Sequence, residues 1–198
     1  MDNKYVNRAK ISEYKFRELA RLFALDLTAT QIAELSGLNR NTVNRYLKGI
    51  RLGIADYCDC QGPLNKAGKE GFEEGINQSD FCVGICEKEG NIYTCIIDSY
   101  ACLNAKTEVY CMLDVFVNFS RGKQKWLLDR DELLKKEPAK VSCISGFKGF
   151  LKSRLEKFKG IHHETYRLHL KESEFRFNNP KEDLYLLMLK IFRNDPLF

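Results

Sequence analysis

Long apolar runs are missing from this chain. None of its hydrophobic stretches approaches the roughly 20 residues that a helix needs to cross a bilayer. The first ten residues, MDNKYVNRAK, also lack the apolar core that a secretory signal carries. Both absences argue against membrane insertion and secretion, so we expect a cytoplasmic protein without a membrane partner.

A Cys-x-x-Cys pair is missing too, although the sequence has 8 cysteines. Structural zinc sites usually bring their ligands in such close pairs, and the nearest approaches are Cys58 with Cys60 and Cys82 with Cys86. In a reducing compartment these side chains are expected to be thiols. Cys82, Cys86 and Cys95 lie in segments that resemble strands, where cysteine packs as a small hydrophobe. A zinc-stabilised interaction module built on the cysteines is therefore an alternative that their spacing does not favour.

A large net charge is also absent: 32 basic residues against 27 acidic ones leave +5. The location of the charge is more informative than its total. Residues 39–51 carry four cations and no acid, and residues 146–160 carry five cations against Glu156 alone. The second segment has two open interpretations, a solvated helix surface or a surface that contacts phosphates. The hydrophobic fraction of 44% is sufficient for a packed core.

Residues 28–51, TATQIAELSGLNRNTVNRYLKGIR, have the pattern of a helix-turn-helix. The spacing predicts a helix from about Thr30, a turn at Gly37 where positive φ is needed, and a third helix capped by Asn39 and ending near Ile50. A preceding helix is predicted to begin after Ser12 as its cap. Apolar side chains that should pack these helices together are Tyr14, Leu19, Leu22, Phe23, Leu35, Val43, Leu47 and Ile50.

The outer side of the third helix is polar and basic, which predicts binding of double-stranded DNA. Arginine and asparagine can pair with guanine and adenine edges, while Lys48 and Arg51 are expected to meet phosphates. The candidate DNA-binding residues are Arg40, Asn41, Thr42, Asn44, Arg45, Lys48 and Arg51.

The rest of the chain alternates between loop, strand and helix patterns. Glycines and Pro63 between residues 58 and 79 favour a long loop, and two apolar runs, 81–86 and 92–97, predict a β-hairpin. Residues 107–119 fit helix or strand equally well. Helices are predicted around Phe147–Phe158, Glu164–Phe177 and Lys181–Arg193.

A family resemblance follows from residues 147–178, FKGFLKSRLEKFKGIHHETYRLHLKESEFRFN. This block closely resembles the C-terminal block of a group of bacterial insertion-sequence transposases of the DDE class. There a helix of the form FWxxAKRRLxKFxG precedes HLKExExRFN. Residues 81–94, FCVGICEKEGNIYT, resemble the early strand pair of the group, VFGLLKRxGKVYT. The resemblance implies an RNase H-like fold, with DNA strand cleavage and transfer at transposon ends.

This chemistry implies carboxylates that hold Mg²⁺. The resemblance places the first at Asp56 by position and the second at Asp129 in WLLD, with Asp114 as a rival. Lys152 matches the lysine of the group's FWxxAK helix. Counting back from it puts Ser145 where the group has a carboxylate, so the third ligand is missing. The implied catalytic residues are Asp56, Asp129 and Lys152, with both aspartates on metal.

Taken together, the sequence predicts an α+β protein with three parts. Residues 1–53 form a helix-turn-helix domain, residues 54–80 a linker with a Gly-rich loop, and residues 81–198 a shortened RNase H-like domain with C-terminal helices. Two functions remain open: a metal-dependent transposase, or a transposase relic that only binds DNA. The sequence leaves the oligomeric state open, and a homo-oligomer is compatible with both.

Overall fold

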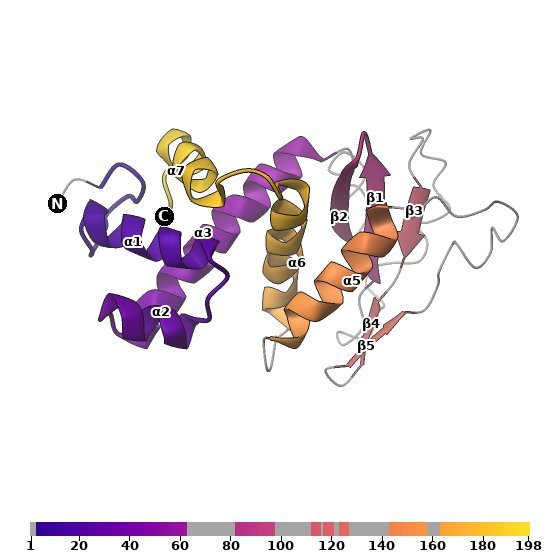
Figure 1. Ribbon diagram of the computed structural model, residues 1–198, viewed down its shortest axis with the longest axis horizontal. Helices are drawn as coiled ribbons and strands as arrows, with labels where there is room; N and C mark the ends of the chain where they lie inside the picture. The colour runs from indigo at the N-terminus through magenta and orange to yellow at the C-terminus, as the bar shows by residue number, and fades with distance from the viewer. Residues whose placement is uncertain are drawn as a thin grey trace, which may run out of the picture. The chain divides into compact units, whose positions relative to one another are not determined.

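A computed structural model describes residues 3–62, 82–97, 112–115, 117–120, 123–126, 143–157 and 163–198 (Figure 1). The chain divides into two units. Unit 1 comprises Met1–Tyr57 and Asn179–Phe198, and unit 2 comprises Cys58–Asn178. The helices are α1 (Glu13–Ala24), α2 (Ala29–Ser36), α3 (Arg40–Gln61), α5 (Cys143–Glu156), α6 (His163–Asn178) and α7 (Leu184–Asn194). The strands are β1 (Cys82–Lys88), β2 (Asn91–Ile97), β3 (Met112–Val115), β4 (Val117–Ser120) and β5 (Lys123–Trp126).

The helices of unit 1 begin at side-chain caps. Ser12 accepts a hydrogen bond from the backbone N–H of Lys15 at the start of α1, as the sequence predicts. Thr28 and Gln31 form a reciprocal capping box at α2, and Asp183 caps α7. Such caps satisfy backbone donors that have no partner within the helix. Local side chains therefore set where α1, α2 and α7 start.

The core of unit 1 is aromatic and aliphatic. Phe16 of α1 lies at its centre, with its ring centroid 5.7 Å from Tyr5, 6.4 Å from Tyr46 and 6.3 Å from Phe192. Phe192 belongs to α7, which packs beside α1 (Figure 1). Unit 1 is therefore discontinuous in sequence, because a helix from the end of the chain completes a core begun by the first 57 residues.

Helix α3 is longer than the sequence predicts. It runs from Arg40 to Gln61 and so covers most of the segment 54–62, which is predicted as linker. Gly49 and Gly53 lower the intrinsic helix propensity on either side of the predicted end at Ile50. Ile54 and Ala55 are fully buried, so packing holds this part of the helix. The rest of the predicted linker, residues 63–80, lies outside the described residues.

Unit 2 contains an antiparallel sheet in the order β2-β1-β3. The predicted hairpin is present, with β1 and β2 joined by Glu89 and Gly90 alone. Both turn residues have positive φ, 54° and 78°, which is the type I′ geometry that matches the twist of the two strands. A further antiparallel pair, β4 with β5, follows β3 along the chain. The segment 107–119 is thus strand wherever it is described.

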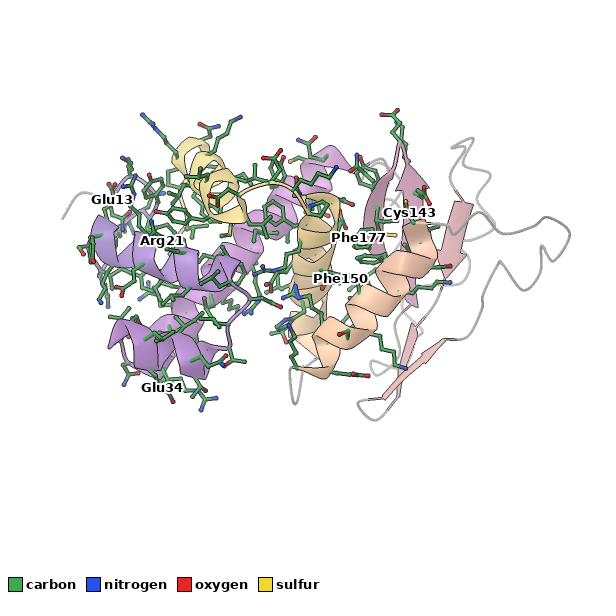
Figure 2. The ribbon with its side chains drawn as sticks, viewed as in Figure 1. Glu13, Arg21, Glu34, Cys143, Phe150 and Phe177 are labelled. Atoms are coloured by element: carbon green, nitrogen blue, oxygen red, sulfur yellow. The ribbon has the colours of Figure 1, made fainter. Side chains whose placement is uncertain are left out.

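Helices α5 and α6 pack against this sheet (Figure 1). The shared core contains Val83 and Ile85 of β1, Ile92 of β2, and residues of both helices that are fully or almost fully buried. The predicted apolar face of α5 is confirmed for Phe147, Leu151 and Leu155, and Phe158 lies outside the described residues. Phe150 and Phe177, labelled in Figure 2, add an aromatic contact between α5 and α6 with centroids 5.7 Å apart.

The α+β class is confirmed, while two details of the expected packing and one domain boundary are not. Tyr14 and Leu35 are predicted in the core of the helix-turn-helix, yet they are 77% and 63% exposed. Helix α7 belongs with unit 1 and not with the sheet domain. Within the described ranges, no helix combines the length and apolar character that crossing a membrane requires.

Candidate nucleic-acid interface

Helices α2 and α3 are joined by a tight turn. Gly37 adopts φ 67°, in the left-handed region that glycine tolerates best, as its position in the sequence predicts. The side chain of Asn39 accepts a hydrogen bond from the backbone N–H of Asn41 at 2.8 Å and so caps α3. Ser36 accepts from the N–H of Leu38 at 3.3 Å inside the turn. These local bonds set the direction in which α3 leaves α2.

One side of α3 is buried and the other is polar. Val43, Leu47 and Ile50 are at most 1% exposed, as predicted from their spacing. At about 100° per residue, the remaining polar side chains fall on one continuous face of the helix. The α3 polar face, defined by its exposed members, consists of Arg40, Asn41, Asn44, Arg45 and Lys48.

The electrostatics of the α3 polar face are one-sided. No acid occurs between Glu34 and Asp56 in the sequence. Glu34 lies on α2, exposed to solvent (Figure 2). Among the described residues, Arg40 and Lys48 make no ion pair. The face thus presents uncompensated positive charge together with amide groups.

Two of the predicted DNA-binding residues border this face on opposite sides. Thr42 and Arg51 are both half-buried. The Arg51 guanidinium lies 5.5 Å from the ring centroid of Phe23, which belongs to α1. Arg51 thus helps to join α3 to α1. The five exposed residues are the stronger candidates for contact with a ligand.

Arg45 lies on the same side of the face as Thr42. Its guanidinium is 5.3 Å from the ring centroid of Phe198, a geometry in which the cation is attracted to the ring face. The Phe198 ring also meets Tyr46 edge-on, with centroids 5.9 Å apart. Sequence patterns do not predict this contact, because residues 45 and 198 are joined only by the tertiary fold of unit 1.

The predicted catalytic residues are distributed between the two units. Asp56 is exposed in the interior of α3, and not after a strand as in the resembling family. Lys152 and Ser145 are exposed on α5 of unit 2, and Asp129 lies outside the described residues. Asp114 pairs with Ile85 in the backbone register of β3 and β1. Where the structure is described, no three His, Cys, Asp or Glu side chains are grouped as metal ligands would be.

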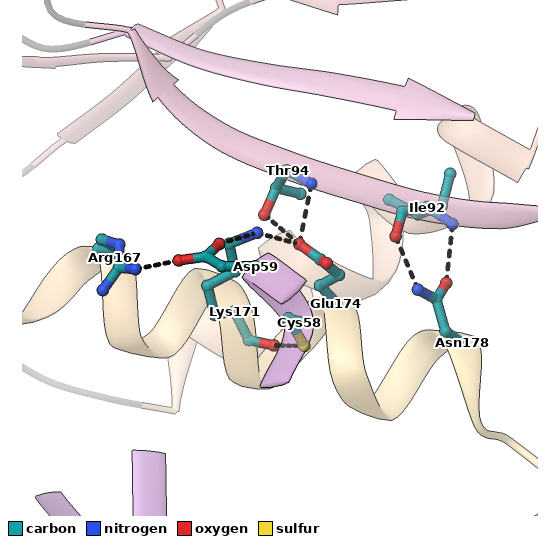
Figure 3. A network of polar contacts seen from close by, with 8 residues as sticks. All are labelled: Cys58, Asp59, Ile92, Thr94, Arg167, Lys171, Glu174 and Asn178. Carbon is teal, nitrogen blue, oxygen red and sulfur yellow. Dashed lines mark hydrogen bonds and ion pairs between the residues drawn. The ribbon is translucent and has the colours of Figure 1, made fainter. Parts of the chain in front are cut away.

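A buried polar network is the feature of unit 2 that sequence reasoning missed (Figure 3). Lys171 of α6 lies 2.8 Å from a carboxylate oxygen of Asp59 and 3.0 Å from one of Glu174. Arg167 pairs with the other oxygen of Asp59. Glu174 accepts hydrogen bonds from the backbone N–H and the hydroxyl of Thr94 at 2.8 and 2.6 Å. The network therefore joins the last turns of α3 to α6 and β2 within unit 2.

A second buried cluster lies on α6. Glu172 is 1% exposed and accepts hydrogen bonds from Arg154 at 2.7 Å and from Arg176 at 3.0 Å. Asn178 donates to the carbonyl of Ile92 and accepts from its N–H, and thereby fastens the end of α6 to β2. The sequence signal was the spacing of Lys171 with Glu174 and of Glu172 with Arg176, which are three and four residues apart. These side chains belong to the HLKESEFRFN block.

Burial and neighbouring charges raise the pKa values of Glu174 and Lys171 in the network. Burial raises the pKa of the Glu174 carboxyl, and the Lys171 ammonium with the Thr94 hydrogen bonds offsets this rise only in part. Burial alone would lower the pKa of Lys171, but the charges of Glu174 and Asp59 outweigh it, and the pKa is raised. Both shifts have the same origin, because one buried cation faces two carboxylates and one of them is almost fully desolvated.

The described cysteines behave as thiols. Cys58, Cys60, Cys95 and Cys143 are free. Cys58 is 5% exposed, and its Sγ lies 3.8 Å from the carbonyl oxygen of Lys171 as a donor. Burial raises the pKa of Cys95 to about 11. Burial of Cys58 and Cys95 favours the neutral thiol. Metal binding and nucleophilic attack would both require the thiolate.

Comparison of the chain with protein-family models, with curated proteins and with solved structures finds no match.

Proposed function

We propose that this protein binds double-stranded DNA through the α3 polar face, with α2 and α3 acting as a helix-turn-helix. The observation that carries the proposal is the placement of Arg40, Asn41, Asn44, Arg45 and Lys48 on one exposed face of a helix that follows a tight turn. An α-helix of this kind fits the major groove, where sequence is read from base edges.

The chemistry of the face suits both parts of DNA recognition. Lysine and arginine that neutralise phosphates release condensed counterions, which supplies affinity at low salt. Asn41 and Asn44 offer amide groups that can pair with adenine, and Arg45 can pair with guanine. Affinity and sequence preference are therefore expected to depend on different residues of the same face.

The test is a titration of labelled duplex DNA of mixed sequence at several salt concentrations. Affinity should fall steeply with salt. The variant Arg45→Ala/Lys48→Ala should lose at least about 1–3 kcal/mol of binding free energy, and its affinity should depend less steeply on salt concentration. The matched control, Lys181→Ala/Lys190→Ala, removes the same charge from exposed positions outside α3 and should bind like the wild type. Equal losses in both variants would contradict the proposal.

As a second candidate we propose DNA transposition, either active or lost in a relic that retains DNA binding. What favours it is that the segments resembling the transposase group come together in unit 2. The strand pair forms β1 and β2, the C-terminal block forms α5 and α6, and all four share one core. Lys152 is exposed on α5, where it is free to approach a phosphate. The RNase H-like assignment of this unit belongs to the same proposal.

The described residues do not provide the carboxylate ligands that the magnesium ions of this reaction would need. Of the two predicted ligands, only Asp56 is described, and it is an exposed residue of unit 1. The hydroxyl of Ser145 is a weaker ligand for a hard cation than a carboxylate would be. The described residues do not by themselves assemble the donor set, so the second candidate includes no defined catalytic step.

A strand-transfer assay with transposon-end DNA and Mg²⁺ separates the two forms of this candidate. An active enzyme should give joined products that disappear in Asp56→Asn and in Asp129→Asn, while both variants still bind DNA. A relic should bind the same DNA and give no product with Mg²⁺ or Mn²⁺. Products that persist in both aspartate variants would exclude the residues proposed as ligands.

A further inference from the structure

Two glycines of α3, Gly49 and Gly53, lie one turn apart and are covered by the end of the chain. A Cβ at residue 53 would lie 2.7 Å from Phe192 Cε1 and 2.9 Å from Leu197 Cδ2. A Cβ at residue 49 would lie 2.5 Å from Phe198 Cζ. Glycine in a helix interior is unfavourable by about 0.5–1 kcal/mol relative to alanine, so its presence here is explained by close packing.

Residues 195–198 are held in place by the backbone of the N-terminal segment. The N–H of Leu197 donates to the carbonyl of Tyr5 at 2.9 Å, and the N–H of Asn7 donates to the carbonyl of Leu197 at 2.8 Å. These bonds form a parallel bridge between Val6 and Leu197. Leu197 is 6% exposed, so the segment is anchored immediately before Phe198.

Phe198 differs from its buried neighbours because 52% of the residue remains exposed. It packs over Gly49 and against Tyr46, and its face is directed at the Arg45 guanidinium. The ring thus lies beside the α3 polar face and touches one of its five members.

We propose that Phe198 is a positioning residue of the DNA interface: its ring holds the guanidinium of Arg45 in place beside the α3 polar face. The proposal rests on the proposed DNA binding. A long side chain that is restrained before binding loses less conformational entropy when it contacts a base or phosphate. Residues 45 and 198, which are far apart in the sequence, would then shape one binding surface.

The test is a double-mutant cycle between Phe198 and Arg45, read as DNA affinity. Phe198→Leu keeps an apolar side chain but removes the ring, and should weaken binding about two- to fivefold, the range of an exposed cation–π contact. The same substitution in an Arg45→Ala background should change affinity by less than about 1.5-fold, because the group being positioned is absent. Phe198→Tyr retains the ring and should bind like the wild type.

Two further variants separate positioning from a general effect on folding. Gly49→Ala adds a methyl group that displaces the Phe198 ring without removing it, and should reproduce the loss seen in Phe198→Leu. Leu186→Ala shortens another exposed apolar side chain of unit 1 and should leave affinity unchanged. All variants are compared at a temperature where thermal unfolding shows each to be folded.

The outcomes distinguish the two proposals. If the wild-type protein fails to bind DNA at low salt, the proposed function is wrong, and the role of Phe198 falls with it. If the wild type binds but Phe198→Leu has no effect, or has the same effect with and without Arg45, only the positioning role is overturned. The positioning role is supported if Phe198→Leu lowers DNA affinity only when Arg45 is present and Phe198→Tyr retains the wild-type affinity.

Discussion

The two units of this protein handle charge in opposite ways. Unit 1 has an interior of aromatic and aliphatic side chains around Phe16, and Ser36 is its one buried polar residue among those described. Its cations stay outside, where Arg40, Arg45 and Lys48 line the α3 polar face. Unit 2 buries Arg154, Lys171, Glu172 and Glu174 between its helices and sheet.

This difference indicates different tasks for similar residues. Exposed cations without an acidic partner are available to a polyanion, and their attraction to it is weakened by salt. Buried ion pairs add little net stability over apolar packing, yet the loss of one partner is strongly destabilising. We infer that charge serves binding in unit 1, while in unit 2 it specifies how α6 meets the sheet.

The largest effect is expected when the network of unit 2 loses its central cation. Lys171→Met leaves Glu174 buried without the cation that pairs with it, and removes one of the cations that pair with Asp59. Removing one partner of a buried pair costs about 3–5 kcal/mol. Denaturant unfolding should show a loss of that size in the free energy of unfolding. Hydrogen exchange of the α6 amides should show that the loss affects this helix.

The matched change in unit 1 should have little effect. Lys4 pairs with Glu13 at 3.2 Å, but its side chain is 46% exposed. Exposed pairs contribute about 0–1 kcal/mol, so Lys4→Met should change stability by no more than that. Similar losses of stability in Lys171→Met and Lys4→Met would contradict the inference that charge has a structural role in unit 2 and not in unit 1.

A smaller effect concerns glycines, and here the sign should differ between the units. Gly53→Ala forces a methyl group against Phe192 and Leu197, and both of these residues are buried. Overpacking of this kind costs about 1–3 kcal/mol and outweighs the gain in helix propensity. Thermal unfolding should show that unit 1 is destabilised.

Gly149 of α5 provides the matched control. It is exposed, with no atom within 4 Å of an added Cβ beyond its own helix. Gly149→Ala should therefore stabilise the protein by about 0.4–1 kcal/mol, through helix propensity and a less disordered unfolded chain. A stabilising Gly53→Ala would mean that the end of the chain does not pack on α3 as described.

Local signals in the sequence predicted local structure well. Ser12, Gly37 and Asn39 are assigned to caps and turns because each interaction spans only a few residues, and all three are confirmed. The β1–β2 hairpin is predicted for the same reason. The predicted end of α3 is wrong because Phe192 and Leu197, which cover Gly53, are distant in sequence.

The candidate site shows the same division between features set by local sequence and features set by tertiary contacts. Periodicity separated the α3 polar face from the buried Val43, Leu47 and Ile50, since both follow from helix geometry alone. The contact of Arg45 with Phe198 and the pairing of Asp59 with Lys171 depend on tertiary structure, which no single segment encodes. The assignments of Asp56 and Asp129 to metal came from resemblance and stay predictions.

The last expected effect is a pH dependence that arises from Glu174 in unit 2. Burial raises the pKa of Glu174 above its ordinary value of 4.5, so the folded state holds this proton more tightly than the unfolded chain. By linkage, this carboxyl makes stability fall as pH rises from 4.5 through its folded pKa. Glu174→Gln replaces the carboxyl with a group that does not titrate. As pH rises over that range, the free energy of unfolding of the wild type should therefore fall relative to that of the variant. The slope is at most about 1.4 kcal/mol per pH unit. A difference that stays constant, or that favours the wild type with rising pH, would mean that pairing with Lys171 outweighs desolvation.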